Sequence, residues 1–237
     1  MNGPPVACSL VGLSIILPVL DEASGIQSTL ALLRPWREQG AEIVVVDGGS
    51  EDGTPALAES GADRVLVSAR GRGAQMNAGA STASGRVLLF LHADTRLPSS
   101  ALPVLAGILE DDAVAWGRFD VRIEGQHWLL PVVARLMNLR SALTGIVTGD
   151  QALFVSRDLF QRVGGFEDIP LMEDVRLSRA LRAFVWPRRL RCCATTSGRR
   201  WDRRGAFRTV LLMWALRLLH SAGVGPHRLA RWYGAVR

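Results

Sequence analysis

The sequence predicts an α/β fold, built on a mostly parallel open sheet with helices on both faces. Short β-branched apolar runs alternate with helix-like stretches through the first hundred residues, as in proteins with a parallel sheet. Acidic and turn-forming residues directly follow three of these runs, in the segments 18–22, 47–53 and 92–94. Ligands of open parallel sheets bind beyond the carboxyl ends of the strands, so we expect these three loops to converge on one pocket.

Local signals set the expected elements of the first half. The strands are expected at 13–18, 42–46, 64–67 and 87–91. The helices between them are expected at 24–40, 54–60 and 73–85. Ser24 and Thr54 are the expected N-caps, and Pro55 suits the first position of the second helix. Pro35 is expected to kink the first helix or to end it early.

The second half follows a less regular pattern. Helices are expected at 99–109, 128–143 and 173–183, extended segments at 113–123 and 149–155, and two helices at the end of the chain. One closing helix is amphipathic, because Phe207, Val210, Leu211, Trp214 and Leu218 follow helical spacing. We expect this apolar face to pack on the core, and interfacial attachment to a membrane is the alternative.

Length and composition indicate one domain with a sizeable core, since 48% of the 237 residues are hydrophobic. The charge is uneven: residues 1–120 hold 14 acidic and 8 basic residues, whereas 121–237 hold 8 and 20. The late excess of arginine suits phosphates, nucleic acid or an anionic membrane surface. Aromatic residues are sparse among these arginines, so we expect no nucleic-acid partner.

The sequence also bears on the compartment. Three cysteines without metal-ligand spacing, two of them adjacent, indicate a reducing environment. The uncharged first twenty residues lack the basic start and the cleavage pattern of a signal peptide. Only eight uncharged residues lie between Arg208 and Arg217, and a membrane span needs about 20. We expect a cytoplasmic protein, with peripheral contact at the inner face of the membrane and a homodimer left open.

Asp47 ends a predicted strand and opens a loop with three glycines and two further acids. Its carboxylate can accept the ring N–H of a nucleotide base, while the glycines let a ligand lie close to the backbone. The alternative is a tight connection in which Asp and Gly serve the turn geometry. The loop alone does not decide between the two.

His92 and Asp94 follow the last strand of the first half, and in extended backbone their side chains point to the same side. The carboxylate of Asp94 suits a divalent cation that bridges two phosphates. His92 can add a nitrogen ligand or hydrogen-bond a phosphate. Arg70 and Arg72 directly precede a helix start, where phosphates are favoured.

Three further clusters carry polar chemistry. Glu173 and Asp174 open a helix, where one of the carboxylates can act as a general base or both can complement the helix dipole. The segment 149–151 can hydrogen-bond a polyhydroxylated ligand or form an ordinary turn. The segment 199–201 combines two arginines with a tryptophan, which suits a diphosphate or an anionic acceptor.

Together these segments resemble the family 2 glycosyltransferases of the GT-A fold, over about residues 12–201. Segment 18–22 looks like the family's opening Pro-x-x-Asn-Glu, segment 46–54 like its Asp-Asp-Gly-Ser-x-Asp-Gly-Thr, and Glu173-Asp174 like its Glu-Asp motif. Segment 199–201 is similar to its Gln-x-x-Arg-Trp element. Segments 91–95 and 149–151 also resemble a small stand-alone branch associated with arsenosugar-type biosynthesis.

The resemblance implies a nucleotide-sugar donor half at about 12–120, an acceptor and catalytic half at about 121–201, and amphipathic helices at about 202–237. Asp47 would bind the base, Asp94 with His92 the metal, and Asp174 would be the catalytic base beside Glu173. The implied nucleotide-sugar site comprises Pro18, Glu22, Asp47, Gly49, Asp52, Arg70, Arg72, Asn77, Ala93, Asp94, Gly149, Asp150, Gln151, Arg199, Arg200 and Trp201. The chain departs from the family pattern at Gly48, His92 and Ser197, where Asp, Asp and Gln are usual.

The resulting hypothesis is an inverting glycosyltransferase that uses a UDP- or GDP-type sugar donor and Mn²⁺ or Mg²⁺. The expected acceptor is a small molecule or a lipid phosphate. A sugar nucleotidyltransferase is one alternative, although its glycine-rich signature would stand where segment 18–22 does. The other alternative is a catalytically inactive protein that binds nucleotide sugars or a membrane surface.

Overall fold

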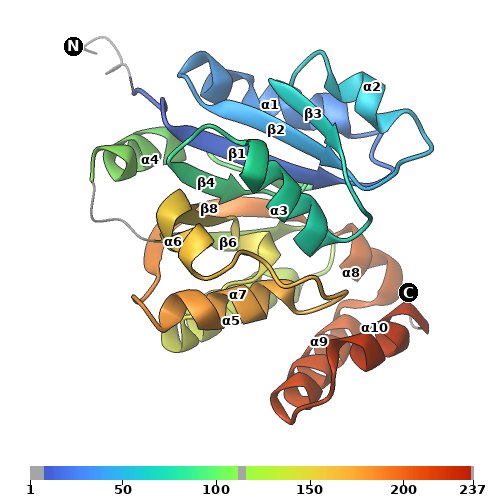
Figure 1. Ribbon diagram of the computed structural model, residues 1–237. Helices are drawn as coiled ribbons and strands as arrows, with labels where there is room; N and C mark the ends of the chain where they lie inside the picture. The colour runs from blue at the N-terminus through green and yellow to red at the C-terminus, as the bar shows by residue number, and fades with distance from the viewer. Residues whose placement is uncertain (1–7, 112–115, 236–237) are drawn as a thin grey trace.

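Four apolar strands form the parallel part of the sheet, in a computed structural model that describes residues 8–111 and 116–235 (Figure 1). They are β1 (Leu13–Val19), β2 (Glu42–Asp47), β3 (Arg64–Val67) and β4 (Val87–Phe90), in the spatial order β3-β2-β1-β4. All neighbours among them pair in parallel, so their carboxyl ends share one edge of the sheet. The predicted α/β fold and its four strands are confirmed.

The sheet continues to eight strands with mixed directions, in the order β4-β7-β6-β8-β5. These strands are β5 (Thr95–Arg96), β6 (Trp116–Glu124), β7 (Leu153–Ser156) and β8 (Arg188–Ser197). The β4/β7, β6/β7 and β5/β8 pairs are antiparallel, whereas β6 and β8 pair in parallel. Sequence analysis missed β5 and β8, and it took Gly149–Gln151 for part of a strand, although these residues form the 3₁₀ turn η1.

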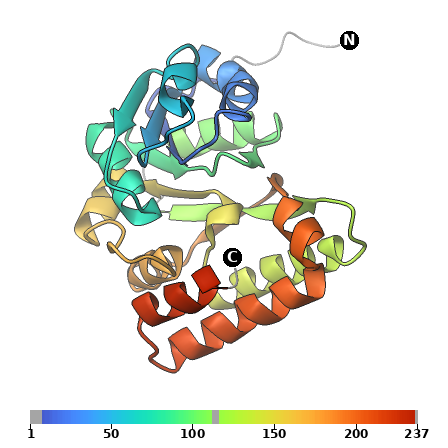
Figure 2. The ribbon, with the colours of Figure 1, turned by 90° about the vertical axis from the view of Figure 1, so that its right-hand side faces the viewer.

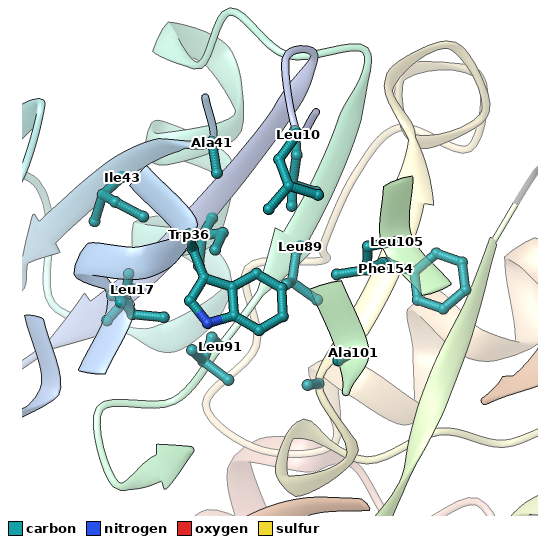
Figure 3. Packing of buried hydrophobic residues seen from close by; sticks show 14 of the residues in the cluster. Leu10, Leu17, Trp36, Ala41, Ile43, Leu89, Leu91, Ala101, Leu105 and Phe154 are labelled. Atoms are coloured by element: carbon teal, nitrogen blue, oxygen red, sulfur yellow. The ribbon is translucent and has the colours of Figure 1, made fainter. Parts of the chain in front are cut away.

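Helices cover both faces of the sheet. One face packs against α1 (Ile26–Glu38), α2 (Thr54–Ala58) and α4 (Ala101–Glu110). The other packs against α3 (Arg72–Thr82), α6 (Arg157–Arg162) and α7 (Glu173–Arg182). Alternation along β1 divides the core, because Ile15 and Leu17 join the first layer and Ile16 joins the second. Figure 3 shows the indole of Trp36 in the first layer, near Leu89 and Leu91.

Three helix boundaries differ from the prediction. α1 begins after Gly25 rather than Ser24, and it continues through Pro35 to Glu38. Thr54 is the first residue of α2, and Gly53, with a φ of 85°, takes the N-cap position. The left-handed backbone at this position favours glycine. Sequence analysis also missed α6, which is only six residues long.

Further helices pack beneath the second half of the sheet (Figure 2). They are α5 (Leu130–Thr144), α8 (Arg199–Arg204), α9 (Ala206–Ser221) and α10 (Pro226–Ala235), so three helices close the described chain instead of two. α9 packs through Leu216 onto α7 and α10. None of the helices described here is both long and apolar enough to cross a lipid bilayer.

The prediction that the apolar face of α9 packs on the core is wrong. Phe207, Trp214 and Leu218 are 66%, 63% and 72% exposed, and Leu211 is also exposed. The buried side chains of α9 instead include Thr209 and His220 beside Leu216. α9 therefore packs on the rest of the protein through a different face from the apolar face that the sequence predicts.

A buried ionic network joins β6, β8 and α5. Arg118, only 1% exposed, donates to the Asp120 carboxylate at 2.6 Å and to the backbone carbonyl of Asn138 at 3.0 Å. Arg189 binds the same carboxylate with both Nε and Nη2. Burial opposes ionisation of Asp120, but the hydrogen bonds from Arg189 and Arg118 outweigh it and lower its pKa. The carboxylate thus neutralises two arginines at the β6 bulge that follows Phe119.

We expect Asp120→Asn to lower the free energy of unfolding by about 3–5 kcal/mol, because it leaves the buried Arg118 without its countercharge. Urea denaturation measures the change. Glu124→Gln is the matched control, since its ion pair with Arg96 is exposed and its loss should cost about 1 kcal/mol or less. Equal effects of the two changes would contradict this account of the network.

Candidate functional site

The loops after β1 and β2 interlock at the carboxyl edge of the sheet. The backbone N–H of Glu22 donates to the Thr54 hydroxyl at 2.9 Å, and that of Ala23 donates to the Asp52 carboxylate at 2.9 Å. Asp52 also accepts from the backbone N–H of Thr54 at 3.0 Å. The hydrogen bond from the Thr54 hydroxyl contributes most to lowering the pKa of Asp52. Asp52 therefore holds the two loops together, and both oxygens of its carboxylate already accept hydrogen bonds.

The carboxylate of Asp47 shapes its own loop. It is buried and accepts the backbone N–H groups of Gly49 and Ser50, both at 2.8 Å, together with the Ser50 hydroxyl. Gly49 has a φ of 90°, a value that favours glycine. This is the tight connection that the sequence offered as the alternative. Contact of Asp47 with a nucleotide base stays a prediction.

Gln75 of α3 ties the ends of β1 and β2 together, a role that sequence analysis missed. Its amide Nε2 donates to the carbonyl oxygens of Val19 and Val46, both at 2.8 Å. Gly48 lies directly against this amide, because a Cβ at position 48 would be 3.0 Å from its carbon. The departure from the family motif at Gly48 therefore has a local packing reason. A glutamine in a helix composed mostly of Gly, Ala, Ser and Thr was its only sequence signal.

His92 and Asp94 lie in a turn, not in extended backbone as predicted, since the N–H of Thr95 donates to the carbonyl of His92 at 3.0 Å. The His92 ring lies against Gly149, and its Nδ1 is 3.8 Å from the Asp150 carboxylate. The backbone carbonyl of Asp94 accepts from the N–H of Ser197 at the end of β8. The premise that strand geometry puts both side chains on one side is therefore wrong.

Asp94 belongs to a group of charges around Glu22, together with Asp52 and Arg199. Burial raises the pKa of Glu22, Arg199 lowers it, and Asp94 and Asp52 raise it further. Adjacent carboxylates that repel one another form a donor set that suits a hard cation. The described residues contain no group of three or more His, Cys, Asp or Glu side chains arranged around a metal position. Oxygens from a ligand would have to complete the coordination of a cation held by Asp94 and Glu22.

Glu173 and Asp174 begin α7 and face the loop that holds Gly149. The N–H of Gly149 donates to Oδ2 of Asp174 at 3.1 Å, and Oδ1 accepts from the N–H of Val175 at 2.7 Å. Glu173 is buried and lies 3.7 Å from the guanidinium of Arg72. Burial and the neighbouring Asp174 raise the pKa of Glu173. A narrow cavity beside both carboxylates is lined by Met76, Phe90, His92, Thr148, Gly149, Leu153 and Phe166.

Several predicted site residues are used for packing or structure. The amide of Asn77 bonds both the N–H and the carbonyl of Phe166, and the fully buried Gln151 caps the η1 turn at Thr148. Trp201 packs against the cluster of α5 and β6. These side chains do not present free polar or aromatic groups to the strand-end loops.

The remaining predicted residues lie around the loops. Pro18 lies within β1, and the carbonyl of Ala93 accepts from the hydroxyl of Thr29 at 2.8 Å. Arg70 is exposed, and Nε of Arg199 donates to the Ser197 hydroxyl at 3.1 Å. Arg200 begins α8 with Arg199, and its side chain lies outside the described part of the chain.

Two arginines that the sequence patterns did not indicate interact with the carboxylates near α7. Arg140 of α5 and Arg217 of α9 both interact electrostatically with Asp174 and Asp150. Each stands in an apolar helix that contains no acidic residue, which was the available signal. A larger cavity of about 290 Å³ lies at the β5, β6 and β8 edge, and none of the predicted site residues lines it.

The comparison with protein families gives a match over more than half of the chain. Residues 14–160 match the family model of Glycosyl transferase family 2. A dolichyl-phosphate beta-glucosyltransferase of Drosophila melanogaster is 33% identical over 129 residues, which cover 44% of this chain and 40% of the fly protein. An uncharacterized glycosyltransferase of Mycobacterium bovis is 30% identical over 125 residues, 52% of this chain and 54% of that protein. The chain thus matches about half or less of the length of these relatives.

Solved structures share the fold. A mannosyltransferase of Pyrobaculum calidifontis in complex with GDP-Man and Mn²⁺ aligns with a TM-score of 0.59 and 21% identity, over 81% of this chain and 58% of the other. Glucosyl-3-phosphoglycerate synthase of Mycobacterium tuberculosis, in complex with Mg²⁺ and UDP, aligns with a TM-score of 0.58 and 20% identity, over 80% and 72% of the two chains. At these identities the likeness concerns the fold.

We expect Gly149→Ala to disrupt the contact between the η1 turn and His92. A Cβ at position 149 would lie 2.2 Å from Cε1 of the His92 ring, so the ring has to move. Overpacking of this kind costs about 1–3 kcal/mol in the free energy of unfolding. Chemical denaturation measures the loss, and the NMR shift of the His92 imidazole reports the displacement.

Gly107→Ala is the matched control for this change. Gly107 lies within α4, and a Cβ there meets no atom within 4 Å. Because alanine favours a helix interior by about 1 kcal/mol over glycine, this control should be neutral or stabilising. If Gly149→Ala is equally well tolerated and the His92 signal does not move, the tight contact is refuted.

Proposed function

The chain belongs to glycosyl transferase family 2; on that premise we propose that it is an inverting glycosyltransferase that moves a sugar from a nucleoside-diphosphate sugar to an acceptor hydroxyl. The observation that carries the proposal is the arrangement of four carboxylates in two groups at one edge of the sheet. Asp94 and Glu22 lie at the ends of β4 and β1, and Glu173 and Asp174 lie at the start of α7. The first group suits the donor diphosphate, and the second suits the acceptor.

The parallel strands supply the donor side of the proposed site. The loop that Asp47 shapes would hold the base, with Arg70 and Arg72 near the nucleotide. Structural neighbours in complex with GDP-Man and Mn²⁺, or with UDP and Mg²⁺, support a nucleotide sugar and a divalent cation as the donor pair. Similarity of fold does not identify the nucleotide base, so we propose a donor of the UDP or GDP type without choosing between the two.

A divalent cation fits the residues that are present. Asp94 would hold it, with Glu22 nearby, whereas His92 lies 3.8 Å from Asp150 and would contact a ligand instead. The cation would neutralise charge on the departing diphosphate. Arg199 lies close enough to Glu22 to lower its pKa and would bind the same diphosphate.

Asp174 would act as the general base. Its Oδ2 is held by the N–H of Gly149 and its Oδ1 by the N–H of Val175, so the carboxylate has a defined orientation beside the cavity. The acceptor oxygen attacks the anomeric carbon, its proton passes to Asp174, and the bond from that carbon to the diphosphate breaks with the electron pair on the leaving group. Glu173 is paired with Arg72 and would hold the guanidinium of Arg72 in place.

A second candidate is a protein of the same fold that binds nucleotide sugars without turnover. Its supporting observation is His92, which replaces an acidic residue of the family's metal motif and lies against Gly149. A sugar nucleotidyltransferase lacks comparable support, because the loop after β1 is the interlocked segment 18–22 rather than a glycine-rich phosphate loop.

The exposed faces of α5 and α9 support peripheral contact with an anionic membrane, as part of the same proposal. The exposed apolar residues are Val132, Leu136, Leu139 and Leu143 on α5, and Phe207, Leu211, Trp214 and Leu218 on α9. α5, α9 and α10 contain no acidic residue and carry the exposed Arg135, Arg208, Arg228 and Arg231. Apolar side chains flanked by arginines match a surface of anionic lipids, and this would place the protein at the inner face of the membrane from the cytoplasm.

Turnover can be tested without knowing the acceptor, through slow transfer of the sugar to water. We expect the protein to release nucleoside diphosphate from one of UDP-glucose, UDP-N-acetylglucosamine or GDP-mannose, and Mn²⁺ or Mg²⁺ should stimulate the release. Asp174→Asn should lower this rate about 10²–10⁴-fold, as expected for loss of a general base. Asp94→Ala should abolish the stimulation by metal.

Thermal shifts with the same nucleotides separate binding from chemistry, because a bound ligand raises the apparent stability. Tight binding without metal-stimulated release would favour the non-catalytic candidate. No binding to any nucleotide would refute the proposed function. A near wild-type rate for Asp174→Asn would refute the base assignment alone.

Membrane contact is tested by flotation with vesicles of phosphatidylcholine and phosphatidylglycerol. We expect the protein to float with these vesicles and to be released by high salt, and Phe207→Ser with Trp214→Ser should abolish flotation. Val67→Ser is the matched control, since Val67 is equally exposed on β3 at the other end of the sheet. Absence of flotation, or a dimer that the double variant dissociates, would overturn the membrane proposal.

A further inference from the structure

Two guanidinium groups meet on the acceptor side of Asp174, and neither belongs to the donor half. Arg140 comes from α5 and Arg217 from α9, and Figures 1 and 2 both show these helices with α7 beneath the sheet. Among the charged side chains, Arg217 has the largest effect on Arg140, and both arginines interact with Asp174 and Asp150. Leu216, next to Arg217, packs with Met172 and Val175 of α7, which holds α9 at this position.

Arg140 lacks partners for part of its guanidinium. Its Nε and Nη2 atoms are buried and have no hydrogen-bond partner. Burial, together with the charge of Arg217, lowers the pKa of Arg140 to about 10. Burial also lowers the pKa of Arg217, against the opposing effect of Asp174 and Asp150. In the part of the chain that the structure describes, neither arginine forms an ion pair within 4.0 Å.

The nearby carboxylates do not pair with the guanidinium groups of Arg140 and Arg217. Asp174 already accepts two backbone N–H groups, and Asp150 lies beside His92. Two half-buried arginines of like charge, one of which has buried nitrogens without a hydrogen-bond partner, are unfavourable for a protein without a ligand. The arrangement becomes favourable when an anion with several oxygen acceptors enters, and a phosphate monoester offers two negative charges to two guanidinium groups.

We propose that Arg140 and Arg217 form a binding site for a phosphate group of the acceptor, so that the acceptor is a phosphate ester. The inference rests on the proposed function. The phosphate positions the acceptor, and a hydroxyl elsewhere in the same molecule is the nucleophile that Asp174 deprotonates. The ester is a soluble metabolite or a lipid at the membrane face of α5 and α9, and the experiment distinguishes these sources.

The first arm uses soluble glycerol 3-phosphate, with chloride at equal ionic strength as the reference. We expect it to raise the melting temperature of the wild-type protein, and Arg217→Gln and Arg140→Met should each weaken binding about tenfold or more, as loss of a buried charge contact does. Arg135→Gln on α5 and Arg208→Gln on α9 are matched controls, because both arginines are exposed, and they should bind as the wild type does.

Arg140→Met also separates a binding role from a structural one. Replacing an unpaired buried charge by an apolar side chain is neutral or stabilising, so the variant should melt at or above the temperature of the ligand-free wild type while losing its response to phosphate. A variant that is strongly destabilised would show that Arg140 holds the fold, which overturns the proposal.

The second arm uses vesicles that contain phosphatidic acid. Binding to these vesicles that Arg217→Gln weakens and Arg34→Gln, at an exposed arginine of α1 outside the membrane face, does not weaken, together with no response to glycerol 3-phosphate, assigns the site to a lipid phosphate. A response to glycerol 3-phosphate assigns it to a soluble ester. If the wild type binds nucleoside diphosphates but neither phosphate probe, the phosphate site is refuted and the proposed function stands. If no nucleotide binds, the proposed function itself fails.

Discussion

Burial of β1, β2 and β4 on both faces is the constraint on which the rest of the structure depends. Strands covered by helices on each side have no free face, so polar chemistry can appear only where they end. Because the three strands are parallel, they end at the same edge, and Gln75 holds two of these ends at a fixed separation. The loops around Glu22, Asp47 and Asp94 therefore meet as a consequence of core packing.

The carboxylates at this edge divide into two groups. Glu22 interacts with Asp52, Asp94 and Arg199, whereas Asp150, Glu173 and Asp174 interact with Arg72. Burial lowers the pKa of Arg72, but the second group of carboxylates outweighs burial and raises it. Negative charge therefore gathers in two places at this edge of the sheet, and only the second group, through Glu173 and Asp174, lines the narrow cavity. In the proposed function the first group would hold a cation with the donor diphosphate, and the second would accept a proton.

The parallel half could be predicted from the sequence because buried parallel strands are continuous apolar runs with turn residues at their ends. β8 could not, since arginines occupy the positions where its side chains reach solvent or bind Asp120, and they hide the alternation. The roles of Asn77 and Gln151 could not be predicted either, because a side-chain amide can bond the backbone, distant for Asn77 and local for Gln151, as readily as a ligand. The exposed face of α9 has the same helical spacing as a buried one. Spacing reports that a face is apolar and leaves open what covers it.

The close approach of Gly48 to Gln75 couples two positions that are distant in the chain. A Cβ at position 48 would lie 3.0 Å from the amide carbon of Gln75, so an aspartate at 48, as the family motif has, would push against the amide that bridges β1 and β2. The glycine at 48 and the glutamine at 75 are therefore best understood as one packing unit, in which the missing side chain of the first leaves room for the second.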